Sequence, residues 1–285
     1  MENIDLHNHS IISDGLMTPS EVVRLAHEGG VTMLALTDHD DVSGLVEAKQ
    51  SADELGMAFI TGVEISVSWR KRTIHLLGLN IDPDFPPLIE GLSVLREGRT
   101  LRAEYMGKEL ARAGISGALE GAKQKAHNPS IISRSHFARF LVDKGYAKDT
   151  AAVFKKFLVP GKVGYVAHEW VPFSEAIDWV LGAGGVPVIA HPGRYKLGIN
   201  VLSDLLDEAV SLGVQGLEVV TGNHSPEQTE WFADECVRRH LLASRGSDFH
   251  GLGESRCLPG RLPDLPPRCA PVWQVWSPQI SGILQ

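Results

Sequence analysis

Cysteine and net positive charge are both scarce in this sequence. Only three cysteines, Cys236, Cys257 and Cys269, occur in 285 residues, too few and too scattered for a disulfide framework or a cysteine-based zinc site. A reducing, cytoplasmic location is therefore expected. The 27 Lys and Arg residues are outnumbered by 35 Asp and Glu residues, which gives a formal net charge of −8. Such a chain is not expected to bind duplex DNA or an anionic membrane, because both need a basic surface.

Long apolar runs are also lacking. No stretch reaches the roughly eighteen consecutive apolar residues of a membrane span, and no basic segment precedes an apolar one at the N-terminus. We therefore expect neither secretion nor a membrane partner, and no obligate protein partner is evident. With 43% hydrophobic and 22% charged residues, the chain has the composition of a globular protein. Its length suits one large α/β domain or one domain that carries an insertion.

Short apolar segments alternate with amphipathic segments in the first and last parts of the chain. The pattern predicts strands over residues 3–9, 31–37, 57–66, 72–80, 186–191, 216–220 and 241–247. It predicts helices over residues 19–28, 42–55, 174–181, 202–212 and 227–239. Strands that alternate with helices in this way indicate parallel βαβ units.

Between about residues 87 and 157 the alternation gives way to helix after helix, rich in Lys and Arg. We interpret this part as a helical insertion, with residues 1–95 and 166–285 as the two parts of a barrel and residues 96–165 as a substrate cap. The proline-rich segment 259–278, with Trp273 and Trp276, is predicted to be irregular and to wrap the foot or rim of the barrel.

A His-x-His pair lies in the first predicted strand. His7 and His9 are two residues apart, so in extended backbone they project to the same side and can bind one ion between them. An isolated pair of this kind is more often satisfied by hydrogen bonds. Here Asp14 adds an oxygen ligand nearby, and Gly15 allows a tight turn. The segment therefore favours a metal site.

Similar polar groups occur at five further strands. They are Asp38, His39 and Asp40 after the second strand, Glu64 in the third, His75 in the fourth, His191 after the fifth, and Asp248 and His250 after the last. In parallel barrels the carboxyl ends of the strands share one face. Taken alone, each residue has an ordinary explanation; Asp38 or Asp40, for example, suits a helix cap. Gathered together, so many imidazoles and carboxylates require cations.

The motifs resemble those of the PHP (polymerase and histidinol phosphatase) family of metal-dependent phosphoesterases. They are Asp-Leu-His-Asn-His-Ser, Thr-Asp-His-Asp, Gly-Val-Glu-Ile-Ser, Ala-His-Pro and Gly-Ser-Asp-Phe-His, in family order across residues 4–250. The resemblance implies an α/β fold, a distorted (β/α)7 barrel of the amidohydrolase-like type with a helical insertion domain. It also implies up to three divalent metal ions, manganese first, with iron, zinc or magnesium as alternatives.

Carried over residue by residue, the resemblance implies three ligand sets. One metal takes His7, His9, Glu64 and Asp248, a second shares Glu64 and adds His75 and His191, and a third takes Asp14, His39 and His250. A metal-bridging hydroxide held by Glu64, Asp248, His191 and His250 would attack phosphorus. Three dications against three carboxylates leave a positive site, which favours a phosphoester over a neutral amide. The acid for the leaving group stays open among His191, His250, Asp40, His224 and water, although a loop or cap role is the commoner one for His224.

A second anion site is expected in the insertion. Residues 132–139 predict a loop that enters a helix, so Arg134, Ser135 and free backbone N–H groups can bind phosphate at a helix N-terminus. Taken alone, the segment is better explained as a solvated helix cap with a surface arginine. The resemblance adds Arg99 and Arg102, and Arg194 is a further candidate. The long insertion is similar to that of the PHP subgroup that hydrolyses 3′,5′-bisphosphonucleotides and short RNA ends.

These observations predict a phosphatase that removes the 3′-phosphate of 3′,5′-bisphosphonucleotides. The alternatives are a 5′-3′ exonuclease on short RNA, a histidinol-phosphate-type phosphatase, a noncatalytic metal-binding module and an amidohydrolase acting on carbon–nitrogen bonds. The expected partner is a small nucleotide, with short RNA as the alternative.

Overall fold

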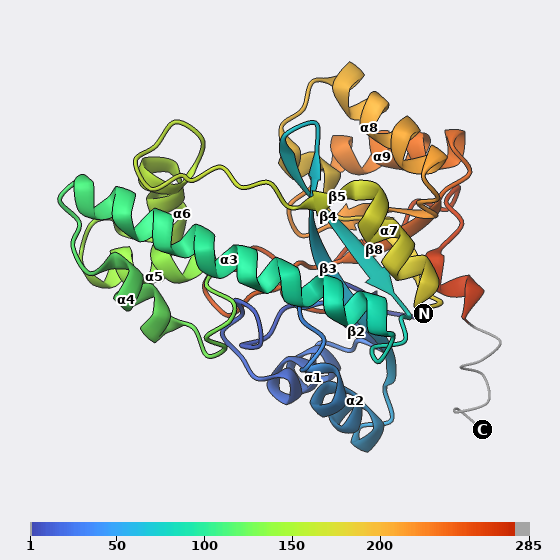
Figure 1. Cartoon of the computed structure of the whole chain (residues 1–285). Helices are drawn as coiled ribbons and strands as arrows, with labels where there is room; N and C mark the ends of the chain where they lie inside the picture. Colours follow the sequence, from blue (N-terminus) through green and yellow to red (C-terminus); the bar gives the residue numbers. More distant parts are fainter. Residues whose placement is uncertain (1, 277–285) are drawn as a thin grey trace.

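The computed structural model describes residues 2–276. Pro278, the last proline of the predicted irregular segment, lies outside the described residues. One mixed sheet forms the centre of the fold (Figure 1), and its strands follow one another in a single order. They are β1 (Ile4–Asp5), β2 (Met33–Leu36), β3 (Ala58–Trp69), β4 (Arg72–Leu79), β6 (Val186–Ile189), β7 (Gly216–Thr221) and β8 (Leu242–Gly246), with β5 (Val171–Pro172) paired to β3 off this path.

The two ends of this sheet meet. The Leu6 N–H donates to the Arg245 carbonyl at 3.0 Å, and the His9 N–H donates to the Phe249 carbonyl at 2.8 Å. The sheet is thus nearly closed, and the predicted seven-stranded α/β barrel is confirmed. Its first strand was predicted too long, because regular pairing with β2 covers only Ile4–Asp5. The following residues stay next to the end of β8, where Asn8 bridges to Phe249.

The direction of β4 corrects the expectation of parallel βαβ units. β4 is antiparallel to β3 and to β6. Only Arg70 and Lys71, with φ of 46° and 62°, separate β3 from β4. Two successive positive φ angles form a tight hairpin turn, whereas a parallel pair needs a crossover of a dozen or more residues. The start of β4, with His75, therefore reaches the edge where the parallel strands end.

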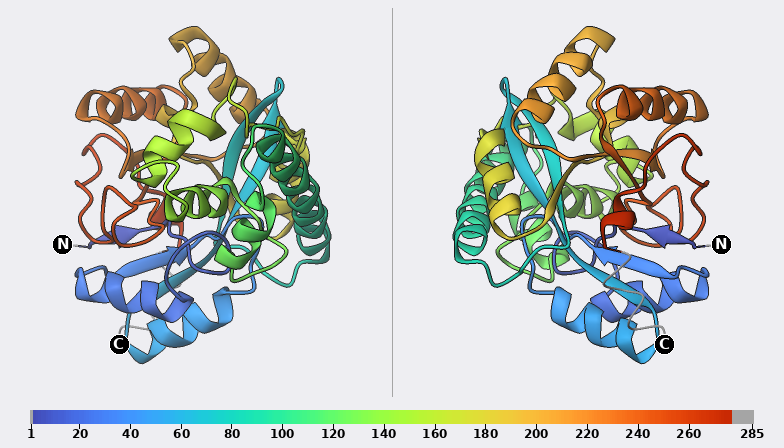
Figure 2. Two further views of the ribbon diagram at one scale, coloured as in Figure 1. Left: turned by 90° about the vertical axis from the view of Figure 1, so that its left-hand side faces the viewer. Right: turned by 90° about the vertical axis from the view of Figure 1, so that its right-hand side faces the viewer.

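Five helices cover the outside of the barrel close to their predicted positions. They are α1 (Pro19–Glu28), α2 (Leu45–Glu54), α7 (Phe173–Gly182), α8 (Ile199–Ser211) and α9 (Pro226–Arg238). The side views place α1 and α2 at one end of the molecule and α8 and α9 at the other (Figure 2). None of the helices in the described part of the chain is long and apolar enough to cross a membrane.

The C-terminal segment closes the foot of the barrel, as predicted. Val272 in the 3-10 turn η3 (Val272–Val275) and the following Trp276 are buried with Ile4, Leu6 and Val188 in one apolar cluster. The Ala243 N–H, near the start of β8, donates to the Ala270 carbonyl at 2.7 Å. Apolar side chains thus fill this end of the barrel, and the polar side chains gather at the opposite end.

The helical insertion has a core of its own. It contains the long α3 (Pro86–Arg112), then α4 (Ala118–Lys125), α5 (Arg134–Asp143), α6 (Thr150–Val153) and the π-helix η1 (Phe154–Leu158). Leu88 and Leu92 at the start of α3 pack in the main core, whereas Met106 and Leu110 near its end pack with Phe137. α3 therefore joins the two parts (Figure 1), and the boundaries at residues 96 and 165 stay a prediction.

Candidate metal centre

Glu64 of β3 lies at the centre of a cluster of imidazoles. Its Oε1 is 2.8 Å from His75 Nδ1 and 2.7 Å from His191 Nε2. Its Oε2 is 2.9 Å from His39 Nδ1 and 3.3 Å from His9 Nε2. The carboxylate is fully buried. With His7 Nε2, which is 3.4 Å from Oε2, this one side chain faces five histidines from four separate parts of the sequence.

The first predicted ligand set converges on one point. The Nε2 atoms of His7 and His9 lie 3.1 Å apart. They are 3.4 and 3.3 Å from Glu64 Oε2, and 3.6 and 3.3 Å from Asp248 Oδ1. Both imidazoles do lie on the same side, as their spacing predicts. Two nitrogens and two oxygens at these separations can surround a single ion.

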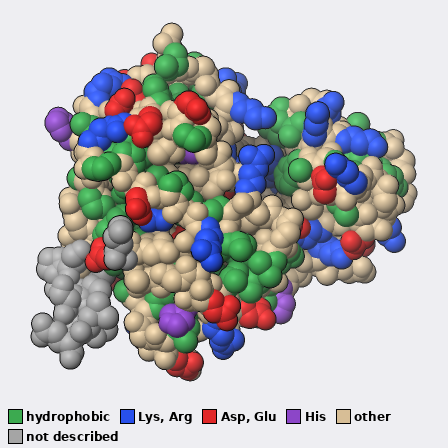
Figure 3. Space-filling model, turned by 180° about the vertical axis from the view of Figure 1, so that it is seen from behind, with side chains coloured by type: hydrophobic (Ala, Val, Ile, Leu, Met, Phe, Trp, Pro, Cys, Tyr) green, Lys and Arg blue, Asp and Glu red, His purple; other side chains and the backbone are tan. Residues whose placement is uncertain are grey.

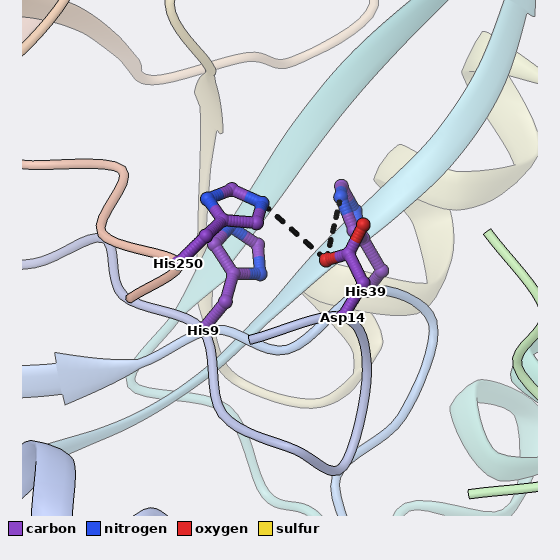
Figure 4. A group of neighbouring side chains, drawn as sticks. All are labelled: His9, Asp14, His39 and His250. Carbon is purple, nitrogen blue, oxygen red and sulfur yellow. Dashed lines mark ion pairs between the residues drawn. The ribbon is translucent and has the colours of Figure 1, made fainter. Parts of the chain in front are cut away.

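The third predicted set also comes together (Figure 4). Asp14 Oδ1 is 3.3 Å from His250 Nε2 and 3.9 Å from His39 Nε2. His9 joins this group, with its ring stacked on that of His250 at 4.1 Å. His9 thus lies between the first and third sets.

The second set is broader than predicted. Glu64 and His75 lie close enough to share an ion with His39 as well as with His191. His191 in turn lies close to His7 and Asp248. All nine predicted ligands therefore belong to one continuous cluster, in which several side chains face two sites.

Three carboxylate oxygens of the cluster have no hydrogen-bond partner among the described residues. They are Asp14 Oδ1, Glu64 Oε2 and Asp248 Oδ1, all buried. Buried polar atoms are almost always paired, and leaving one unpaired costs roughly 1–3 kcal/mol. Divalent cations would satisfy these oxygens, and a mixture of imidazole and carboxylate ligands suits several such ions. The residues present therefore fit the metal centre that the sequence predicts.

The pKa values of the imidazoles in the cluster differ. Burial lowers the pKa of His39 to about 4, and burial with the nearby Arg194 lowers the pKa of His191 to about 3. Burial opposes charge on His7 as well, but Glu218, Glu64 and Asp248 outweigh it and raise its pKa well above the ordinary value. Cations bound here would take over the role of that proton, since metal binding displaces protons from its ligands.

Glu218, which the sequence analysis missed, orients two of these ligands. This buried residue of β7 accepts a hydrogen bond from His7 Nδ1 at 3.0 Å and another from the His191 N–H at 2.6 Å. Fixing the proton on Nδ1 leaves His7 Nε2 free for a metal. A Cβ on Gly246 would come within 2.7 Å of Glu218 Oε1, so glycine is needed there. The sequence carried one sign of this role, a single carboxylate in a predicted strand that is otherwise mostly apolar.

Asp38 does not cap a helix, contrary to the alternative considered for it. It accepts hydrogen bonds from Ser10 N and Oγ at 2.8 and 2.6 Å and from Ser13 Oγ at 2.5 Å. The next helix begins later, at Leu45. Arg139 of α5 donates to the Asp14 carbonyl at 2.6 Å. Asp38 and Arg139 thus hold the loop that presents Asp14.

Arg99 occupies a buried ion pair rather than an open anion site. Its Nε donates to Asp40 Oδ2 at 2.6 Å, and one terminal nitrogen donates to Ser66 Oγ at 2.8 Å. The other Asp40 oxygen accepts from the Ser66 N–H at 2.7 Å. Arg99, predicted to bind substrate, and Asp40, considered as an acid, therefore stabilise each other between α3 and β3.

Arg194 pairs with a predicted metal ligand. Its Nη1 contacts Asp248 Oδ2, which also accepts from Asn223 Nδ2 at 3.3 Å. The other oxygen, Oδ1, faces His7 and His9. The Arg194 side chain is 47% exposed and that of Asp248 only 1%. The guanidinium thus lies at the surface of the centre, where it can contact both the ligand and a substrate.

Arg102 and Arg134 lie near each other at the insertion side. Burial lowers the pKa of Arg102 to about 9, with Arg134 and Arg99 adding to the effect. Arg102 donates to the Val166 carbonyl at 3.1 Å, and the Arg134 guanidinium lies 5.7 Å above the Phe154 ring. In the described part of the chain, no acid forms an ion pair with either arginine. Two such neighbouring cations attract an anion. A hollow edged by basic side chains separates the insertion from the barrel (Figure 3).

The helix at Arg134 begins as predicted, but its amides are less free than expected. Ser133 caps α5, and its Oγ accepts the Ser135 N–H at 3.0 Å, while His136 Nδ1 accepts the Ser133 N–H at 3.0 Å. The cap therefore satisfies amides that were expected to meet a phosphate. The Arg134 side chain is the stronger anion contact.

His224 has a structural role. Its Nδ1 bonds to the Val219 carbonyl at 3.0 Å, its Nε2 accepts from the Gly193 N–H at 3.1 Å, and its ring stacks on Phe232. Both nitrogens are engaged, so His224 is not the acid.

The PHP domain family matches residues 5–168. This chain belongs to the PHP family. It is 49% identical over 274 residues to a 3′,5′-nucleoside bisphosphate phosphatase of Chromobacterium violaceum, which covers 96% of each chain. It is 41% identical over 275 residues to the 5′-3′ exoribonuclease Rnm of Escherichia coli K12, covering 96% of this chain and 93% of the relative.

A solved structure supports the same assignment. It is that of a Chromobacterium violaceum protein described as an amidohydrolase, with bound sulfate and no metal. Its TM-score is 0.94 at 48% identity, over 97% of this chain and 96% of the other. With the family, the relatives and the ligand cluster together, this PHP protein is a metal-dependent phosphoester hydrolase.

Proposed function

We propose that this PHP enzyme removes the 3′-phosphate from 3′,5′-bisphosphonucleotides such as adenosine 3′,5′-bisphosphate, which leaves the 5′-mononucleotide and phosphate. One observation carries the proposal: besides the cluster of candidate metal ligands there is a second, cationic site, formed by Arg102 and Arg134, that has no acid partner in the described part of the chain. Two separate anion sites suit a substrate with two phosphates. The 49% identical relative, named for this activity, supports it.

The proposed cofactor is a set of three divalent ions, manganese first, with iron, zinc or magnesium as alternatives. The ligands are the nine residues of the cluster: His7, His9, Asp14, His39, Glu64, His75, His191, Asp248 and His250. When bound there, such ions lower the pKa of water and polarise a phosphate. The orphaned oxygens of Asp14, Glu64 and Asp248 support this set.

The remaining roles fall to side chains of the chain itself. Glu64, Asp248, His191 and His250 are proposed to place the attacking water. Arg134 and Arg102, with Ser135 beside them, would hold the 5′-phosphate and so fix the position of the 3′-phosphate. Holding the substrate in this way aligns its 3′-phosphate with the attacking water. Arg194 would contact the phosphate under attack, because it is exposed beside Asp248.

A second candidate is 5′-3′ exonuclease action on short RNA. It is supported by the 41% identical relative Rnm, and it would break the same kind of O3′–P bond. A histidinol-phosphate-type phosphatase is less well supported, because it gives no use to the cationic site in the insertion. The proposed setting is the cytoplasm, with a small nucleotide as partner.

The test is the release of phosphate and of adenosine 5′-phosphate by manganese-loaded protein from matched substrates. Adenosine 3′,5′-bisphosphate, adenosine 3′-phosphate, adenosine 5′-phosphate and a 5′-phosphorylated diadenylate would be compared at equal concentration. The proposal predicts adenosine 5′-phosphate and free phosphate from the bisphosphate, at a higher kcat/KM than from either monophosphate. Cleavage of the dinucleotide with no action on the bisphosphate would replace it with the second candidate.

A further inference from the structure

A cavity of about 430 Å³ opens beside the turn that follows His191. The turn η2 (Pro192–Tyr195) forms one wall, and the starts of α8 and α9 form the others. Two residues of the turn, Pro192 and Gly193, line the cavity, so it begins directly next to a predicted metal ligand. Removal of a terminal phosphate makes no use of this space.

The cavity and the arginine site lie in different directions from the metal centre. α8 and α9 stand away from α4, α5 and α6, which form the far end of the insertion (Figure 1). Arg134 and Arg102 belong to the insertion side, whereas Arg194 and Lys196 belong to the turn beside the cavity. Consider a substrate whose 5′-phosphate binds the insertion and whose next phosphate lies at the metal centre. If it has a second nucleotide, that nucleotide would extend toward this turn.

The lining suits a flat apolar ring. Leu197, Leu202, Phe232 and the half-buried Trp231 form apolar walls, and an indole is a sequence-tolerant stacking surface for nucleobases. Among the described residues, the carbonyl oxygen of the Gln228 side chain is already used by the Ser225 N–H, which leaves its amide group to donate.

The cavity lining carries one basic and one acidic side chain, Lys196 and Glu227, and Glu227 already accepts a hydrogen bond from Ser225 Oγ at 2.7 Å. Lys196 lines the cavity and forms no ion pair or side-chain hydrogen bond with the described residues. Arg194, two positions earlier, contacts Asp248. A phosphate between these two cations would connect a nucleotide in the cavity to the centre.

We propose that this cavity binds the base of the second nucleotide of a 5′-phosphorylated oligoribonucleotide, on the 3′ side of the phosphate under attack. The inference rests on the proposed function, because the same bond is hydrolysed. Water adds its hydroxyl to phosphorus, the P–O3′ bond breaks, and O3′ of the first nucleotide takes the proton. The phosphate stays on the 5′ oxygen of the second nucleotide, whose base stacks on Trp231.

The experiment compares kcat/KM for three substrates: adenosine 3′,5′-bisphosphate, 5′-phosphorylated diadenylate, and the same dinucleotide with an abasic second sugar. The variants are Trp231→Ala, Trp231→Phe and Lys196→Gln. Val237→Ala is the matched control, because Val237 is exposed on the same helix outside the cavity. Trp231→Ala should lower kcat/KM for the diadenylate by about tenfold, from the loss of one base stack. It should leave the bisphosphate and the abasic dinucleotide within twofold, and Trp231→Phe should restore most of the loss.

Other results would overturn the inference. Equal effects of Trp231→Ala on all three substrates, or no effect on any, would remove the cavity from substrate binding. A wild-type dimer that Trp231→Ala converts to a monomer by size-exclusion chromatography, without a change in diadenylate hydrolysis, would assign the cavity to a second copy of the chain. If Trp231→Ala fails to fold, Lys196→Gln decides, with a loss confined to the dinucleotides expected. A wild-type enzyme inactive on both bisphosphate and diadenylate would refute the proposed function itself, and this inference with it.

Discussion

Glu218 accepts a hydrogen bond from His7 Nδ1 at 3.0 Å, although the two residues are 211 positions apart in the sequence. The pair fixes which nitrogen of His7 faces the cluster, and the same carboxylate accepts the His191 N–H. Because outer carboxylates of this kind orient metal ligands, Glu218→Gln should weaken metal binding by roughly 10- to 100-fold.

Calorimetric titration of the metal-free protein with manganese would measure that loss. Glu120→Gln, at an exposed position of α4, is the control. An unchanged dissociation constant in Glu218→Gln would show that His7 needs no outer partner.

Arg99 should matter to folding more than to catalysis. Its ion pair with Asp40 is buried, and removing one partner of such a pair leaves a charge without compensation, at a cost of roughly 3–5 kcal/mol. Arg99→Met should therefore lower the free energy of unfolding by that amount in urea titrations. Arg112→Ala, which breaks an exposed pair with Glu109, should change it by less than about 1 kcal/mol. If Arg99→Met were as stable as wild type and lost activity only on bisphosphates, Arg99 would be assigned to substrate binding instead.

Arg134 should act on the second phosphate alone. Hydrogen bonds to a charged group contribute roughly 1.5–3 kcal/mol, so Arg134→Ala should lower kcat/KM for adenosine 3′,5′-bisphosphate by about 10- to 100-fold. A simple aryl phosphate, which lacks the second anion, should be hydrolysed at the wild-type rate. Lys148→Ala, at a site 86% exposed, controls for general loss of positive charge. Equal losses on both substrates would contradict the two-phosphate account.

His136 should make stability fall in mild acid. Burial lowers its pKa to about 4, from 6.5 in the unfolded chain, and the neutral Nδ1 accepts the Ser133 N–H. The unfolded state therefore binds the proton first, so this contribution is complete above pH 6.5 and is lost as pH falls toward 4. The loss reaches up to about 3 kcal/mol.

Urea titrations of wild type and His136→Gln between pH 7 and 4 would isolate this effect, since glutamine can accept the same hydrogen bond. As pH falls, the free energy of unfolding should decrease more for wild type than for His136→Gln. A constant difference would contradict the assignment. His27→Gln, at an exposed site of α1, is the control.

The sequence predicted that the nine candidate ligands come together, because each follows or lies in an apolar strand and the strand ends of a barrel converge. His75 was predicted as a ligand although the direction of its strand was not. The turn at Arg70 and Lys71 lacks the glycine or asparagine that usually marks such a hairpin.

Partners that meet only in three dimensions were missed. Glu218 resembles an outward-facing residue of its strand until the position of His7 is known. Arg99 resembled a phosphate contact because its acid partner, Asp40, lies 59 positions away in sequence. The local sequence pattern predicts which residue types reach the site. Ion pairs formed in the folded chain decide which of these side chains remain available to bind a ligand.

The most direct test of the account is phosphate release from adenosine 3′,5′-bisphosphate by chelator-treated protein, before and after manganese is restored, with Asp248→Asn alongside. Asp248 contacts the histidines of the first ligand set through Oδ1 and Arg194 through Oδ2. We expect no release without metal, full recovery on reloading in wild type, and little recovery in Asp248→Asn. Equal phosphate release by metal-free and metal-loaded protein would contradict it.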